Sequence, residues 1–218
     1  MSMRDVLRRW REPRPSAERS RWLVLDVESS GLDPGRDRLL AIAAIAVQVE
    51  PGRAVIDLAD SFEAVLLQSD SGAALDRENI LLHGIGVGAQ RAGLERRTAL
   101  QAFAAFVGAA PLVAFHAAFD RAMIERAFAL EALSMPANPW LDLEPLAAVL
   151  QPGINARSLD EWMAAMGIRC LLRHQAAADT LATAELLLKL WPLLQTELGQ
   201  PEFRAVAKLA SLRRWLPG

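Results

Sequence analysis

Asp26 and Glu28, two carboxylates two residues apart, are the first side chains in the sequence whose types and spacing suit catalysis. They follow a short apolar run, Trp22 to Leu25, which predicts a buried strand, and Gly31 ends this pattern. Because side chains alternate between the faces of a strand, we expect Asp26 and Glu28 to point the same way. Their mutual repulsion would be relieved by a divalent cation between them. The alternative is that the strand has ended and both carboxylates face water.

Two further aspartates, Asp120 and Asp179, open the apolar faces of predicted helices. Helical spacing places Asp120 on one stripe with Met123 and Ile124, and Asp179 on one stripe with Leu186. A first-turn aspartate also caps N–H groups, which is the preferred explanation for either residue alone. For both on inward faces, together with the carboxylate pair at the strand end, a shared metal site is the more economical interpretation.

His174 lies five residues before Asp179, and this separation would place the two on different sides of one helix. We therefore expect His174 in the loop just before the helix, over the same site. Most histidines are neither ligands nor bases. A neutral imidazole beside an acidic cluster can, however, take a proton from water.

The elements that must position these residues begin with three strands and continue with alternating strands and helices. The sequence predicts strands within 22–28, 39–49, 54–67, 111–115 and 140–143, and helices at 98–107, 118–130, 158–166, 177–190 and 202–215. Residues 68–93 are expected to be irregular. Short turns between the first three strands predict an antiparallel meander, so the fold class is α/β, a mixed sheet flanked by helices.

Length and composition describe one ordinary globular domain. The 218 residues are 52% hydrophobic and 23% charged, and no apolar run approaches the roughly 20 residues of a membrane helix. Without a signal peptide pattern, we expect a cytoplasmic protein that does not engage a membrane. One cysteine, Cys170, excludes an internal disulfide, and a net charge of −2 argues against a large surface for duplex nucleic acid.

Three motifs resemble those of the DnaQ-like, DEDDh 3'-5' exonucleases: D-x-E-S-S-G-L at Asp26 to Leu32, F-H-A-A-F-D at Phe115 to Asp120, and H-Q-A-A-A-D at His174 to Asp179. This family includes the proofreading subunit of bacterial replicative polymerase (the polymerase III epsilon type), ribonuclease T and oligoribonuclease. The resemblance covers roughly Trp22 to Leu190. It implies a ribonuclease H-like fold, whose mixed five-stranded sheet has an antiparallel meander followed by parallel strands and is flanked by helices.

The resemblance also implies a mechanism and its residues. Two divalent cations, Mg²⁺ or Mn²⁺, would activate water and release nucleoside 5'-monophosphates from single-stranded 3' ends, with DNA slightly favoured over RNA. The implied metal ligands are Asp26, Glu28, Asp120 and Asp179, and the implied general base is His174. The implied substrate contacts are Ser29, Ser30, Gly31, Leu32, His83, His116 and Phe119.

The motifs depart from the family pattern in three places. Ser29-Ser30 replaces the usual Thr-Thr, which keeps both hydroxyls. Phe115-His116 replaces the common His-Asn and leaves substrate positioning open. Gly86 follows the H-G-I stretch that starts at His83, where threonine is usual. A loop histidine without a role is the alternative for His83, and a core aromatic ring is the alternative for Phe119.

We divide the chain into a flexible basic leader (1–20), an exonuclease domain (21–195) and a C-terminal amphipathic helix (196–218) that packs on the domain or serves association. The expected partners are a single-stranded DNA or RNA 3' end, with a homodimer or a polymerase-type protein as further candidates. Alternative functions are a catalytically weak module of the same fold that binds nucleic acid or a partner, and a short-RNA trimming enzyme. A phosphatase using Asp26 is disfavoured by Glu28 and by the two distant lysines, Lys189 and Lys208.

Overall fold

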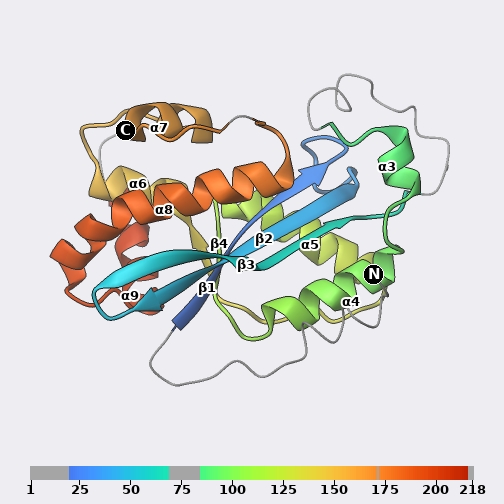
Figure 1. The fold of residues 1–218 in the computed structure, drawn as a ribbon, viewed down its shortest axis with the longest axis horizontal. Coiled ribbons are helices and arrows are strands. Elements are labelled where there is room, and N and C mark those ends of the chain that lie inside the picture. The colour runs from blue at the N-terminus through green and yellow to red at the C-terminus, as the bar shows by residue number, and fades with distance from the viewer. Residues whose placement is uncertain (1–19, 69–83, 171, 216–218) are drawn as a thin grey trace.

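The computed structural model describes residues 20–68, 84–170 and 172–215, and its centre is a five-stranded sheet in the order β3-β2-β1-β4-β5 (Figure 1). The strands are β1 (Ser20–Ser29), β2 (Leu39–Glu50), β3 (Arg53–Val65), β4 (Leu112–Ala114) and β5 (Trp140–Asp142). The first three are antiparallel, while β4 pairs in parallel with β1 and with β5. The predicted mixed sheet, a meander followed by parallel strands, is therefore confirmed.

Seven α-helices accompany the sheet in the described part of the chain. They are α3 (Val87–Arg91), α4 (Arg96–Val107), α5 (Ala117–Leu130), α6 (Leu143–Leu150), α7 (Leu159–Met166), α8 (Ala176–Leu198) and α9 (Phe203–Ala210), with a 3₁₀ helix at Ser211–Trp215. None of these helices has both the length and the apolar character needed to cross a bilayer. Most of the basic leader (1–19) and residues 216–218 lie outside the described residues.

Two helices, α3 and α6, were not predicted from the sequence. Helix α6 starts directly after β5, without the loop that usually separates two elements, and its first turn contains Pro145. Asp142 ends the strand and caps the helix, because its side chain accepts from the Glu144 N–H (3.2 Å). Helix α8 also continues past the expected end at Leu190, through Pro192, since Leu194 is fully buried in the core.

Two hydrophobic cores lie on opposite faces of the sheet, and β1 contributes to both. Trp22 and Val24 belong to the core under α6, α7, α8 and α9, whereas Leu23 and Leu25 belong to the core under α4 and α5. This alternation continues the pattern expected for a central strand. The next two residues on the same face as Trp22 and Val24 are Asp26 and Glu28, so these carboxylates lie on the α8 side of the sheet.

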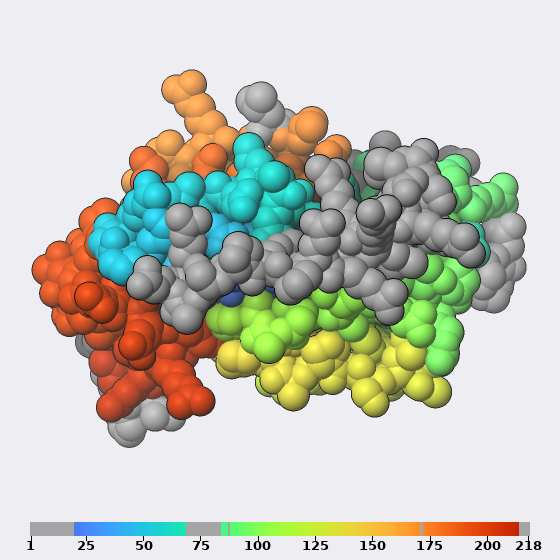
Figure 2. Space-filling model, turned by 60° about the horizontal axis from the view of Figure 1, so that its bottom comes forward, coloured from blue at the N-terminus to red at the C-terminus, as the bar shows by residue number. Residues whose placement is uncertain are grey.

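The C-terminal segment packs on the rest of the domain within the described residues. The Trp22 ring meets Trp191 and Phe203 edge to face, at centroid distances of 5.5 and 5.1 Å. Val206 of α9 is fully buried. Figure 2 shows the C-terminal residues, in red, beside the cyan β2–β3 hairpin.

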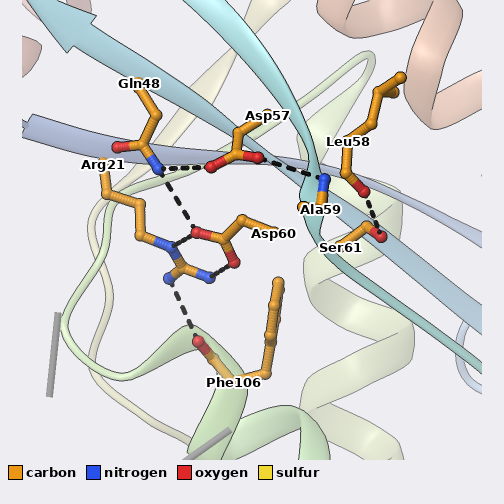
Figure 3. A network of polar contacts seen from close by, with 8 residues as sticks. All are labelled: Arg21, Gln48, Asp57, Leu58, Ala59, Asp60, Ser61 and Phe106. Atoms are coloured by element: carbon orange, nitrogen blue, oxygen red, sulfur yellow. Dashed lines mark hydrogen bonds and ion pairs between the residues drawn. The ribbon is translucent and has the colours of Figure 1, made fainter. Parts of the chain in front are cut away.

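A wide bulge interrupts the pairing of β2 and β3, where the sequence suggests one continuous strand. The register passes from Ala46↔Asp57 to Ile45↔Ser61, so three residues of β3 have no partner on β2. Figure 3 shows how one of them, Asp60, faces the Arg21 guanidinium, which donates to both carboxylate oxygens (2.7 and 2.8 Å). Arg21 also donates to the Phe106 carbonyl (3.1 Å) and thereby connects β1, the bulge and α4.

We expect Arg21→Met to lower the free energy of unfolding by about 3 kcal/mol, because it leaves the carboxylate of Asp60 buried without this cation. The side chains of Arg21 and Asp60 are only 16% and 5% exposed. Denaturant titration of both proteins measures the loss. Arg121→Met is the matched control, since it removes an ion pair with Glu125 whose side chains are 55% and 48% exposed, and it should cost about 1 kcal/mol or less. Equal losses in the two variants would contradict a special role for the Arg21 pair.

Candidate active site

Three carboxylates meet at the end of β1 on the α8 side of the sheet. Asp26 and Glu28 extend from β1, and Asp179 extends from the first turn of α8. One ligand oxygen from each residue lies within 4.8 Å of those of the other two. The two strand residues share a face because they are two positions apart, and α8 packs across this face.

Asp120 approaches the same place from the opposite side of the sheet. Its helix, α5, packs into the other core through Met123 and Ile124, and Asp120 itself is 4% exposed. The carboxylate accepts from the Val27 N–H (3.1 Å) and is close enough to Asp26 to raise its pKa. Asp120 therefore reaches the cluster around the strand end and borders the tight group of three.

The carboxylates perturb one another strongly. Burial raises the pKa of Asp26 well above its ordinary value, and the charges of Asp120, Glu28 and Asp179 raise it further. Burial and the charge of Asp179 raise the pKa of Glu28 to about 7. The cluster thus holds more negative charge than its surroundings neutralise. Hard oxygen donors with uncompensated charge are what a divalent cation such as Mg²⁺ or Mn²⁺ requires, so these residues fit such an ion.

The raised pKa of Glu28 predicts a pH-dependent stability of the metal-free protein. Between about pH 4.5 and about 7 the folded state keeps a proton that the unfolded chain releases, so stability falls as pH rises through this range. We expect Glu28→Gln to be more stable than the parent at about pH 8 in chelator, by on the order of 1 kcal/mol after solvent screening, with little difference at about pH 4.5. Thermal unfolding at both pH values measures this, with the exposed Glu197→Gln as control. A gain that is the same at both pH values would contradict it.

His174 lies in the loop before α8, as expected. Its backbone is left-handed (φ 60°), and its N–H donates to Asp179 Oδ2 (3.1 Å). The half-buried imidazole is near enough to Asp160 of α7 to help lower the pKa of that carboxyl, behind the larger effect of Arg173. Asp179 therefore joins the acidic cluster and also holds the loop that carries His174.

Arg173 was not singled out from the sequence, although this residue immediately precedes His174, the first residue of the third motif. Its guanidinium binds Asp160 through Nε (2.5 Å) and Nη2 (3.3 Å) and forms an ion pair with Asp179 through Nη1. Its charge also acts to lower the pKa values of Asp26 and Glu28. The sequence signal that could have identified Arg173 is a basic residue directly before a motif that contributes an aspartate to an acidic cluster.

The loop after β1 is organised by Asp37, another residue that the sequence did not single out. Asp37 accepts from the Ser30 hydroxyl (3.1 Å), and a Cβ on Gly31 would lie 2.5 Å from its Oδ2. The Ser29 hydroxyl donates to the Gly31 carbonyl (2.6 Å). The two hydroxyls thus shape the loop. Leu32, in the same loop, is 89% exposed.

The second motif turns sharply between β4 and α5. His116 is exposed and left-handed (φ 58°), and its N–H donates to Asp142 Oδ1 (3.0 Å). Asp142 is a third residue that the sequence did not single out. Phe115 is buried in the α8-side core, and the half-buried Phe119 packs against the α4–α5 core. Neither phenylalanine of this motif is therefore fully exposed.

The H-G-I stretch is described only in part, because His83 lies outside the described residues. Ile85 packs against Ala41 and Ala43 of β2 and against Ala176, in the first turn of α8. Gly84 is left-handed (φ 69°), and a Cβ there would lie 3.5 Å from Gln175 Nε2. This segment therefore borders the loop that carries His174.

Comparison with known sequences places this site in a family. The family model for exonucleases of the RNase T type matches residues 23–187. The DNA polymerase III subunit epsilon-like protein of Rhodobacter capsulatus is 32% identical over 188 residues, which are 85% of this chain and 25% of that protein. The DNA polymerase III PolC-type of Halalkalibacterium halodurans is 30% identical over 168 residues, 77% of this chain and 11% of that protein. The chain thus spans a quarter or less of the length of these relatives.

Solved structures share the fold at lower identity. Escherichia coli exonuclease I in complex with a dT13 oligonucleotide has a TM-score of 0.67 at 22% identity, covering 83% of this chain and 42% of that one. Cell-death related nuclease 4 has a TM-score of 0.68 at 14% identity, covering 80% of this chain and 64% of that one. These neighbours have the ribonuclease H-like fold that the motifs implied. The chain belongs to the exonuclease family of nucleases, in its DnaQ-like group.

Proposed function

We propose that this chain is a metal-dependent 3'-5' exonuclease that removes nucleoside 5'-monophosphates from single-stranded 3' ends. One observation carries the proposal. Four carboxylates from β1, α5 and α8 converge on one strand end, and Asp179 of this set also holds the loop of His174. A structural role for four neighbouring acids would leave most of their repulsion uncompensated, since the ion pair of Arg173 engages only one of them, Asp179.

Each residue has a place in this mechanism. Asp26, Glu28 and Asp179 supply ligand oxygens from the α8 side, and Asp120 supplies one from the α5 side. These residues would hold two divalent cations, which would supply Lewis-acid activation of water and charge stabilisation at the leaving 3' oxygen. His174, on its loop, would accept a proton from the attacking water.

The substrate and partner extend the proposal. We favour DNA slightly, because the relatives are named as polymerase III proteins and a structural neighbour is an exonuclease bound to a dT13 oligonucleotide. We assign to Leu32, which is exposed and lies four residues after Glu28, the contact with the terminal base. The same names support a polymerase-type partner for this chain.

Digestion of 5'-labelled DNA and RNA strands of matched sequence tests the proposal. With Mg²⁺ or Mn²⁺ we expect a ladder that shortens from the 3' end and the release of nucleoside 5'-monophosphates, and none of this in chelator. Absence of shortening with either ion, or shortening that persists in chelator, would reject the proposal. The ratio of the DNA and RNA rates decides the substrate class.

A binding module without turnover is the second candidate. The observation in its favour is the second motif, where His116 stands at the position of the family's common asparagine and is held in a left-handed turn. Tight binding of a labelled 3' end without any product would favour this candidate over the exonuclease.

A further inference from the structure

Arg173 places a positive charge on a carboxylate of the acidic cluster. Its Nη1 forms an ion pair with Asp179 Oδ1, and Asp179 is one of the three residues whose ligand atoms lie within 4.8 Å of one another. The Arg173 side chain is 21% exposed and that of Asp179 8%, so solvent screens this contact only partly. An arginine here carries its charge at any working pH.

The same guanidinium has a second carboxylate outside the cluster. Asp160, in the first turn of α7, accepts from Nε (2.5 Å) and Nη2 (3.3 Å), and its side chain is 58% exposed. Arg173 therefore spans from α7 to α8, with Asp160 on the solvent side and Asp179 on the cluster side. If the ion pair with Asp179 were lost, the two hydrogen bonds from Arg173 to Asp160 would remain.

A cation at the cluster and the guanidinium compete for Asp179. Both carry positive charge, and both bind the same carboxylate, whose other oxygen is already used by the His174 N–H (3.1 Å). Two positive charges a few ångströms apart repel one another. Occupation of the cluster by a divalent cation therefore favours the arrangement in which Arg173 retains Asp160 alone.

We propose that Arg173 is a built-in counter-ion of the acidic cluster, which pairs with Asp179 when no divalent cation is bound and withdraws to Asp160 when one binds. This inference rests on the proposed metal site and adds a positioning residue to it. Arg173 lowers the affinity of the site for metal and holds the His174 loop against α8 until the ion arrives. Asp160 is the alternative partner that makes withdrawal favourable.

Mn²⁺ binding without nucleic acid tests this inference, with the free Mn²⁺ followed by electron paramagnetic resonance. We expect Arg173→Met to bind Mn²⁺ about three- to tenfold more tightly than the parent, because the competing charge is gone. We expect Asp160→Asn to bind about threefold more weakly, because Arg173 then depends on Asp179 alone. If Arg173 had a purely structural role, Arg173→Met would bind Mn²⁺ more weakly than the parent, which is the opposite of the change we expect.

Arg169→Met is the matched control, because Arg169 is an exposed arginine in the same loop. Its Mn²⁺ affinity should stay within about twofold of the parent. Arg173→Gln replaces the Met variant if the latter does not fold. An affinity of the Arg173 variants equal to or weaker than that of the parent overturns the inference, even when the parent digests nucleic acid. Absence of Mn²⁺ binding in every variant overturns the proposed function together with it.

Discussion

Asp26→Asn is expected to lower nuclease activity by roughly 10²- to 10³-fold or more, while it raises the melting temperature of the metal-free protein. The activity falls because a ligand oxygen and a negative charge leave the centre of the cluster. The stability rises because Asp26 is desolvated and repelled by Asp120, Glu28 and Asp179, and the neutral amide has nearly the same shape. Digestion of labelled oligonucleotides and thermal unfolding in chelator measure the two effects.

Opposite signs of the two effects distinguish this prediction from simple misfolding. A misfolded variant would lose activity and stability together. Glu197→Gln, at the exposed end of α8, removes the same charge far from the cluster and should change neither quantity. Full activity of Asp26→Asn would remove this residue from the proposed site. Mn²⁺ should also stabilise the parent against heat and have little effect on the variant.

His174→Asn is expected to reduce the rate of digestion by roughly 10²- to 10⁴-fold and leave Mn²⁺ binding nearly unchanged. This substitution removes the side chain that is proposed to accept the proton. Its backbone N–H, which donates to Asp179 Oδ2 (3.1 Å), is retained. Asparagine is chosen because it tolerates the left-handed backbone of this position (φ 60°) better than most residues. Single-turnover digestion and Mn²⁺ titration measure the two quantities.

His174→Gly provides the control for backbone strain, since glycine adopts the same left-handed conformation without a side chain. Both variants should be equally slow if the imidazole accepts the proton. Digestion by either variant at the rate of the parent would exclude His174 as the base. A parallel loss of Mn²⁺ affinity in both would instead show that the residue acts by holding Asp179.

Much of the sheet was predictable because its signals are local. The alternation of Trp22 and Val24 with Leu23 and Leu25 reflects the two faces of a strand, and short turns indicate antiparallel neighbours. The long α8 and the unpredicted α6 were harder. Continuation of α8 through Pro192 depends on burial against distant residues, and α6 follows a strand without any intervening turn signal.

The sequence by itself determined which side chains are proposed to carry the chemistry, namely the carboxylates and histidine of three motifs, and it determined the shared face of Asp26 and Glu28. The shared face follows from periodicity, and the set of residues follows from their types and from the resemblance of the three motifs to a known family, none of which needs knowledge of distant contacts. The tertiary structure decided that Asp120 arrives from the opposite face, that Asp37 braces the loop after β1, and that Arg173 lies on Asp179. The first of these contacts joins residues far apart in the chain, which the packing of α5 on the sheet brings together. The contacts of Asp37 and Arg173 span only a few positions, but they depend on the conformation of irregular loops, which no periodic pattern predicts.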